Sequence, residues 1–250
     1  MDYTYFTHMK HADGVRHCIS RKNSDQAIDF SLAYHTGEDP KAVQSNRQMI
    51  QSIMDPRAHF VSPLQVHGDH IHVVRRQQSR GWDCLDRTLE ADALVTNVRG
   101  VVLTILTADC VPVLIYDPRQ KAIGAVHAGW QGTHKQIVRK TVEKMNALYG
   151  SKPSDLIVGI GPAIGGCCYE VGADVAEHFW DDPHVVHPVK HEKFLLDLKE
   201  ANRQQLESAG VIASRIEISR ECTVCASDRY FSHRAEPGCT GRFMGCISIS

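Results

Sequence analysis

A chain of 250 residues with 42% hydrophobic content can bury one substantial core, which predicts a single domain over residues 1–250 and argues against a disordered chain. The 28 Lys and Arg residues nearly balance the 29 Asp and Glu residues, so no net charge favours binding to nucleic acid or to an anionic membrane. The nine cysteines lack the dense spacing of small secreted domains and favour reduced thiols in the cytoplasm.

The N-terminal half is expected to be rich in strands. Residues 1–16 lack the apolar region of a signal peptide, so we expect no export. An apolar run over residues 60–66 predicts a strand that ends in His67. Residues 71–74 and 93–96 predict two further strands around a polar surface loop at 77–90.

Residues 101–116 form the most hydrophobic stretch, but Asp109 and Pro112 interrupt it. It is too short to span a bilayer of about 30 Å as a helix, so it predicts two core strands that meet at a turn carrying Cys110. A third apolar run, residues 124–126, leads to His127.

Helical spacing of apolar residues first appears over residues 133–149, where Thr133 is the expected N-cap and Gly150 the expected stop. The remaining elements are expected at 156–158 (strand), 198–206 (helix ended by Gly210), 216 (strand) and 243–249 (strand). Strands outnumber helices and alternate with them irregularly. This pattern predicts an α+β fold, a mixed β-sheet core flanked by helices, while a parallel doubly wound sheet stays the alternative.

A candidate metal ligand lies at the end of each of three predicted strands. These residues are His67, Cys110 and His127. A thiolate and two imidazoles make a partial zinc shell with a fourth position open for water, which is typical of a catalytic site. Two other interpretations stay open at this stage: a buried structural cysteine with two histidine neighbours, or a cysteine nucleophile activated by His127.

Several motifs resemble the YfiH/YlmD family, the laccase-domain or former polyphenol oxidase family whose members are now described as purine nucleoside phosphorylases. They follow the family's order along nearly the whole chain. The segments are 34–40 with 46–47, Gln-Val-His-Gly at 65–68, 91–96, Thr-Ala-Asp-Cys at 107–110, His-Ala-Gly-Trp at 127–130, 159–165 with 168–170, and 231–234.

The resemblance implies a YfiH-like fold and a cytoplasmic enzyme that phosphorolyses adenosine, inosine and S-methyl-5′-thioadenosine and also deaminates adenosine. Its implied partners are purine nucleosides and orthophosphate, with neither nucleic acid nor membrane. The family's zinc ligands fall on His67, Cys110 and His127, with copper as an alternative metal.

The chemistry suggests further site residues. Asp109, next to Cys110, is a candidate to move protons or to orient the ligand. Arg47 and Arg234 are candidate cations for phosphate. At the position after His-Ala-Gly-Trp, where the family usually has Arg, this chain has Gln131.

Alternative functions are a copper-dependent polyphenol oxidase, a metal-free cysteine hydrolase that uses Cys110, and a purine-binding protein without turnover. A polyphenol oxidase needs a cluster of paired histidines, and the sequence offers one His-x-His, at residues 70–72.

Two motifs outside the candidate site could mislead. The glycines of residues 159–165 have the wrong spacing for a dinucleotide site and predict a tight turn in the pocket wall. Cys222 and Cys225 form a C-x-x-C, but Cys239 and Cys246 do not supply a second pair, which favours reduced, unlinked thiols over a second zinc site. The adjacent cysteines at 167–168 are expected to be structural.

Overall fold

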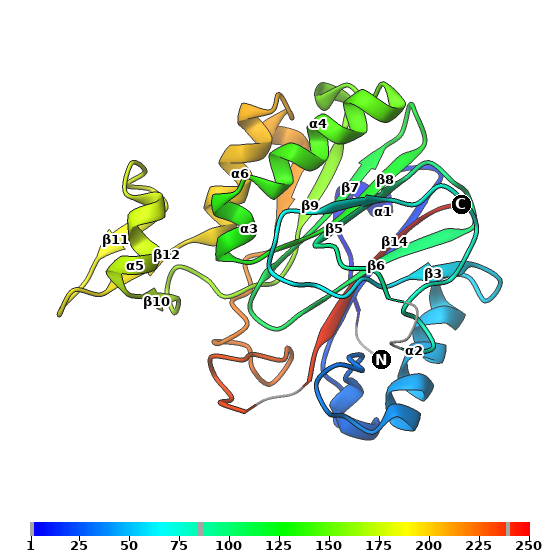
Figure 1. Cartoon of the computed structure of the whole chain (residues 1–250), viewed down its shortest axis with the longest axis horizontal. Coiled ribbons are helices and arrows are strands. Elements are labelled where there is room, and N and C mark those ends of the chain that lie inside the picture. Colours follow the sequence, from blue (N-terminus) through cyan, green and yellow to red (C-terminus); the bar gives the residue numbers. More distant parts are fainter. Residues whose placement is uncertain (1–2, 85–87, 239–240) are drawn as a thin grey trace.

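The computed structural model describes residues 3–84, 88–238 and 241–250 and arranges them in four layers (Figure 1). Two mixed β-sheets pack face to face. Three helices cover the outer face of one sheet: α3 (Trp130–His134), α4 (Ile137–Tyr149) and α6 (Leu198–Ser208). Helix α2 (Pro40–Met54) covers the outer face of the other sheet. The α+β prediction is therefore confirmed, with two large sheets instead of one.

The larger sheet has six strands in the order β13-β9-β7-β8-β5-β4. Its strands are β4 (Ile71–Val73), β5 (Ala93–Thr96), β7 (Val111–Asp117), β8 (Ala122–Ala128), β9 (Ile157–Ile160) and β13 (Ile216–Ile218). The second sheet has the order β1-β2-β14-β6-β3. Its strands are β1 (Tyr3–Thr4), β2 (Val15–Ser20), β3 (His59–Val61), β6 (Val101–Thr107) and β14 (Phe243–Ile249).

A small lobe projects from the layered body on the left of Figure 1. It holds a three-stranded sheet and a short helix: β10 (Glu170–Val171), β11 (Val186–Pro188), β12 (Phe194–Leu196) and α5 (Ala173–Ala176). A one-turn helix, α1 (Thr7–Lys10), and four 3₁₀ turns complete the described elements: Ala27–Phe30, Pro153–Asp155, Glu177–Phe179 and Ala213–Arg215.

The central strands are buried on both faces. In β7, Val113 and Ile115 pack toward helices α4 and α6, whereas Leu114 and Tyr116 pack toward the other sheet. β6 is likewise buried at every position. This double burial explains why these segments are continuous apolar runs without polar alternation.

Most predicted strands are confirmed, but two segments of the N-terminal half differ. The expected strand over 60–66 stops at Val61, because Pro63 lacks the N–H that a ladder needs and only isolated bridges continue it. The loop 77–90 is not wholly on the surface, since Trp82 is 4% exposed and stacks on Phe60 with ring centroids 4.1 Å apart.

The expected helix over 133–149 is two helices. Gln136 has φ 61° and separates α3 from α4, so Thr133 lies inside α3 and is not an N-cap. Gly150 ends α4 at φ 70°, as expected, and α6 begins at the N-cap Asp197. Within the described residues, no helix combines the length and the hydrophobicity that crossing a membrane requires.

Candidate metal centre

The three predicted ligands meet where the two sheets join. β6 belongs to one sheet and β7 to the other, and Cys110 lies in the turn that crosses between them. His127 lies near the end of β8, opposite Pro112, and His67 lies on the loop after β3. One ligand atom of each side chain lies within 4.8 Å of the other two, so the three can share one metal ion.

Asp92 holds the His67 turn in place. His67 adopts the left-handed conformation with φ 59°, which is uncommon for a residue with a side chain. The Asp92 carboxylate is fully buried and accepts the main-chain N–H groups of Val66, His67 and Gly68, at 3.3, 3.0 and 2.7 Å. Three successive N–H groups around one carboxylate compensate for the strain and fix the direction of the His67 side chain.

Asp92 also orients His127. Its Oδ1 lies 2.9 Å from Nδ1 of the buried His127 ring, so the imidazole presents Nε2 to the site. Burial raises the pKa of Asp92, but His127 and the N–H groups of Gly68 and Val66 outweigh burial and hold that pKa below its usual range. A carboxylate behind a histidine ligand is the usual support of a metal-binding imidazole.

Cys110 is prepared as a thiolate. Burial raises its pKa, but His127 and His67 together lower that pKa to about 6. Burial lowers the pKa of His127, but Cys110 and Asp92 outweigh burial and raise that pKa to about 9. Thiolate is the form of cysteine that binds metal.

The backbone leaves room for the three donors. A Cβ at Gly129 would lie 3.1 Å from Sγ of Cys110 and 3.2 Å from Cδ2 of His67. Glycine therefore lets the start of α3 approach the ligands closely. The donor set, its support by Asp92 and this space fit a bound metal ion.

Asp109 is a second strained residue with a fully engaged carboxylate. It has φ 92°, and its Oδ1 accepts the hydroxyls of Thr223 and Ser232 at 2.6 and 2.7 Å. Its Oδ2 accepts the main-chain N–H of Arg234 at 2.7 Å. Asp109 thus ties the Cys110 turn to the C-terminal segment that carries Arg234.

A pocket of about 380 Å³ opens over the metal centre. This volume lies in the range of small-molecule sites. The guanidinium of Arg234 packs over the Tyr169 ring at 5.3 Å, and its Nη1 donates to the Glu170 carbonyl at 2.8 Å. The lining residues that carry polar groups besides the metal donors are His35, Gln65, Thr107, Asp109, Tyr169, His233, Arg234 and Arg242.

Arg47 does not line this pocket. It is 2% exposed, and its guanidinium donates to the main-chain carbonyls of Leu32, Gly81 and Trp82 at 2.9, 2.7 and 2.8 Å. The expectation that it binds phosphate is therefore corrected: the helix α2 arginine fastens two loops to the core.

Among the pocket or support residues that were not predicted as site residues are His35, Asp92, Tyr169, His233 and Arg242. The first four lie in segments that resemble the family, so the resemblance carried their signal. Arg242 had no such signal. Gln65 also lines the pocket, but its side-chain amide donates to the Leu106 carbonyl and accepts the Leu106 N–H. These two hydrogen bonds make it a structural residue.

Comparison with known proteins extends over most of the chain. Residues 17–250 match the family described as multi-copper polyphenol oxidoreductase laccase. The purine nucleoside phosphorylase YlmD of Geobacillus stearothermophilus is 36% identical over 226 residues, which are 87% of this chain and 82% of the relative. A purine nucleoside phosphorylase of Deinococcus radiodurans is 39% identical over 214 residues, 85% of this chain and 79% of the relative. The crystal structure of YfiH from Bacillus licheniformis matches with a TM-score of 0.89 at 33% identity, covering 94% of this chain and 93% of that one.

Proposed function

We propose, given that this chain belongs to the family described as multi-copper polyphenol oxidoreductase laccase, that it is a zinc-dependent purine nucleoside phosphorylase. Its substrates would be orthophosphate with adenosine, inosine or S-methyl-5′-thioadenosine. The observation that carries the proposal is one pocket that joins a His-Cys-His donor group to two arginines. Curated relatives that cover most of the chain bear the phosphorylase name.

Zinc is the metal that this donor set suits best. One thiolate and two imidazoles are borderline ligands that favour Zn²⁺ and leave one position for water or substrate. When bound, Zn²⁺ supplies a Lewis acid that polarises an oxygen ligand. His67, Cys110 and His127 would hold it, and Asp92 would keep both histidines in place.

Arg234 is the proposed phosphate ligand. Phosphorolysis requires orthophosphate beside C1′ of the ribose, and planar guanidinium groups bind phosphate through paired N–H groups. Tyr169 and the Glu170 carbonyl hold the Arg234 guanidinium at the pocket. Arg242 lines the same pocket and adds positive charge, whereas Gln131 is exposed and does not line it.

The departing purine requires a proton or a hydrogen-bond donor. His35 and His233 are the lining histidines outside the metal donor group. Burial, with the nearby cations Arg242 and Arg47, lowers the pKa of His35, so its imidazole is neutral at pH 7 and keeps one N–H. We assign His35 the donor role toward the base.

Asp109 is proposed as a positioning residue. Its carboxylate already accepts three hydrogen bonds, which leaves it poorly placed to carry protons to a substrate. It would instead keep Cys110 and Arg234 in register. Adenosine deamination, also proposed, would take place in the same pocket and release inosine without phosphate.

The geometry bears on the two other enzyme classes. A multicopper oxidase needs a blue-copper site and a histidine-rich copper cluster. Over residues 3–84, 88–238 and 241–250, the two groups able to share an ion are the His-Cys-His group and a group of four cysteines. Cys110, His127 and Asp92 also form a series that a cysteine hydrolase could use, and that activity would survive chelation but not thiol alkylation.

Product analysis tests the proposal. Purified protein is incubated with adenosine, with and without phosphate, and the products are separated by chromatography. We expect adenine and ribose 1-phosphate only with phosphate, inosine in both reactions, and loss of both activities in Cys110→Ala. Cys84→Ser, which changes an exposed thiol outside the pocket, is the control. Intact adenosine with a zinc-loaded protein would refute the assignment.

A further inference from the structure

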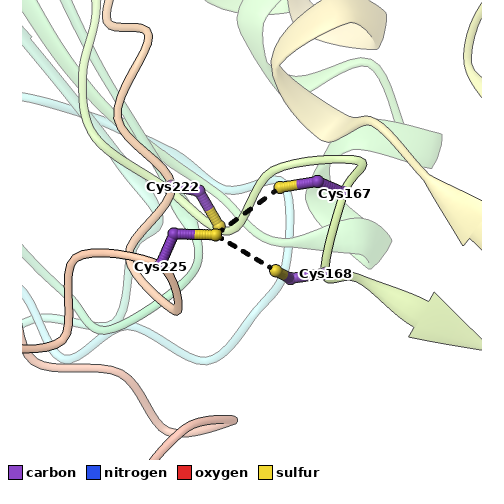
Figure 2. Close-up of side chains that lie close together, drawn as sticks. All are labelled: Cys167, Cys168, Cys222 and Cys225. Carbon is purple, nitrogen blue, oxygen red and sulfur yellow. Dashed lines mark hydrogen bonds between the residues drawn. The ribbon is translucent and has the colours of Figure 1, made fainter.

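Four cysteines from two distant segments of the chain meet at one point (Figure 2), and none of them belongs to the His67, Cys110 and His127 group. Cys167 and Cys168 lie between β9 and β10, and Cys222 and Cys225 follow β13. All four Sγ atoms lie within 4.8 Å of one another. Sγ of Cys225 lies 3.4 Å from that of Cys168 and 3.9 Å from that of Cys167, and none of the four is in a disulfide.

These separations match a single tetrahedral ion. With Zn–S bonds of about 2.3 Å, the edge of a sulfur tetrahedron is about 3.8 Å. The two measured distances lie on either side of that value. A disulfide requires sulfurs about 2.05 Å apart. An iron–sulfur cluster binds its thiolates on different irons and would spread them more widely.

The main chain favours a thiolate at Cys222, whereas burial raises the pKa of Cys167 and of Cys168. Gly165 donates its N–H to Sγ of Cys222 at 3.2 Å, and a Cβ at Gly165 would lie 3.2 Å from Sγ of Cys167. Burial raises the pKa of Cys222, but the N–H groups of Cys225, Gly165 and Val224 outweigh burial and lower that pKa to about 7. N–H groups directed at sulfur stabilise the charged form of the thiol.

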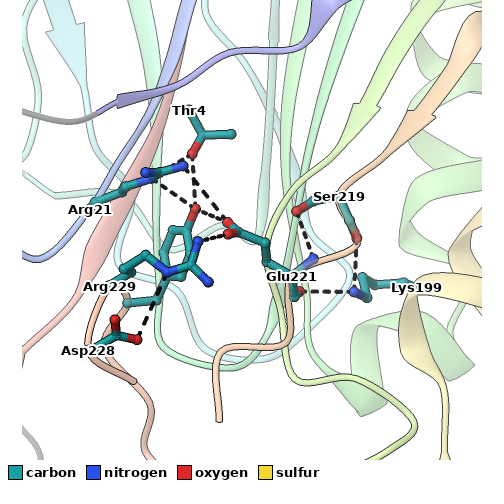
Figure 3. A network of polar contacts seen from close by, with 8 residues as sticks. Thr4, Arg21, Lys199, Ser219, Glu221, Asp228 and Arg229 are labelled. Carbon is teal, nitrogen blue, oxygen red and sulfur yellow. Dashed lines mark hydrogen bonds and ion pairs between the residues drawn. The ribbon is translucent and has the colours of Figure 1, made fainter. Parts of the chain in front are cut away.

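A fixed cation offsets the charge that four thiolates would bring. Lys199 donates from Nζ to the carbonyls of Ser219 and Glu221 at 2.9 and 3.0 Å, which holds its ammonium against the segment that leads to Cys222 (Figure 3). On the other side of that segment, the Glu221 carboxylate binds Arg229 and the Tyr230 hydroxyl. The Cys222–Cys225 turn is therefore anchored from both sides before any metal binds.

We propose that Cys167, Cys168, Cys222 and Cys225 bind one Zn²⁺ through four sulfurs, as a structural site separate from the His67, Cys110 and His127 centre. Cys246 is not part of it because it is buried beneath helix α2, and Cys239 lies outside the described residues. The site needs no second C-x-x-C motif, because the other two ligands are the adjacent cysteines 167 and 168, which end 54 residues before Cys222.

This zinc fastens two walls of the pocket. Ile164 and Tyr169 flank the first cysteine pair and line the pocket, and Thr223, between the second pair, donates its N–H to Ala163 and its hydroxyl to Asp109. A bound ion would lock the two loops together behind that contact. Its loss would loosen the wall that positions Asp109.

Metal counting tests the site without any assay of nucleosides. The protein is produced with added zinc and purified under reducing conditions without a chelator. The number of zinc ions per chain is then measured by elemental mass spectrometry. We expect two zinc ions in the unaltered protein, one in Cys225→Ser and one in Cys110→Ala. Cys84→Ser, an exposed cysteine outside the cluster, should keep two.

Cobalt substitution in Cys110→Ala keeps the proposal testable if the cluster variants unfold. That protein retains all four cluster cysteines, and one bound Co²⁺ should give the visible absorption of a tetrahedral ion and strong thiolate charge-transfer bands. A folded Cys110→Ala protein that takes up no zinc or cobalt when reduced would overturn the proposal. So would one zinc in Cys110→Ala that remains after Cys225→Ser is added. Neither result depends on whether the protein is a phosphorylase.

Discussion

Replacing Asp92 by Asn should weaken metal binding and stability together. The fully buried Asp92 carboxylate accepts the N–H groups of residues 66, 67 and 68 and faces Nδ1 of His127. Asparagine keeps one oxygen and turns an NH₂ group toward some of these donors. Each buried donor left unpaired costs about 1–3 kcal/mol, so two of them lower the free energy of unfolding by about 2–6 kcal/mol.

The same substitution removes the support of two metal ligands. Loss of such a partner typically costs 10–100-fold in metal affinity, or about 1.4–2.7 kcal/mol. Zinc affinity is measured by competition with a chromophoric chelator on Cys225→Ser protein, which isolates the His-Cys-His centre, and unfolding is followed in urea. Asp117→Asn is the matched control, because Asp117 is also fully buried and accepts two N–H groups in a turn after β7, outside the pocket lining.

The control also removes a buried carboxylate, but its remaining oxygen can still accept both N–H groups, and it should keep its zinc affinity. An Asp92→Asn protein that binds zinc as tightly as Asp117→Asn would refute the role assigned to Asp92 at the metal centre.

Three other substitutions test separate parts of the structure. His17 accepts the Phe6 N–H in the core, and burial lowers its pKa to about 4; the unfolded chain therefore binds more protons between pH 4 and 6.5, and stability falls as the pH drops through that range. Between pH 7 and pH 5, His17 should lower the free energy of unfolding by about 2 kcal/mol. The free energy of unfolding of His17→Gln, measured in urea, should therefore fall by about 2 kcal/mol less over this range than that of the unaltered protein. An equal fall in both proteins would contradict the lowered pKa of His17. Arg47→Met should lower the free energy of unfolding by about 3 kcal/mol or more, because three buried carbonyls lose a charged donor. The KM for phosphate should stay unchanged. A raised KM would show that Arg47 does contribute to phosphate binding. Gly129→Ala should weaken zinc affinity about tenfold, since its Cβ would press on Cys110, and an unchanged affinity would show that the start of α3 can move.

The strands and the meeting of the three candidate metal ligands were the most predictable features, for the same physical reason. Cys110 and His127 directly adjoin apolar runs that can only be core strands, so their position at strand ends follows from the pattern. His67 lies beside Cys110 and His127 although its strand ends early at Val61, because Asp92 holds the loop that follows the strand. Asp92 itself gave no signal of its own beyond the family resemblance, since its partners lie 24 to 35 residues away.

Other features depend on packing that no local pattern encodes. The apolar spacing of residues 133–149 runs through Gln136 without a Gly or Pro to mark the break between α3 and α4. Arg47 was expected at the pocket because arginine suits phosphate, yet its partners are carbonyls of loops 15 and more residues away. The cysteine cluster likewise joins segments more than 50 residues apart.

The four-layer arrangement also governs which positions can vary in evolution. Since both faces of β6 and β7 are covered, neither strand has a solvent side on which a polar substitution is neutral. Each polar replacement there would bury an unpaired group, at about 1–3 kcal/mol. Sequence drift among relatives should therefore concentrate on the outer faces of α2, α4 and α6 and in the projecting lobe of β10, β11, β12 and α5. The exposed positions of these elements are thus the places where substitutions carry the lowest risk to folding.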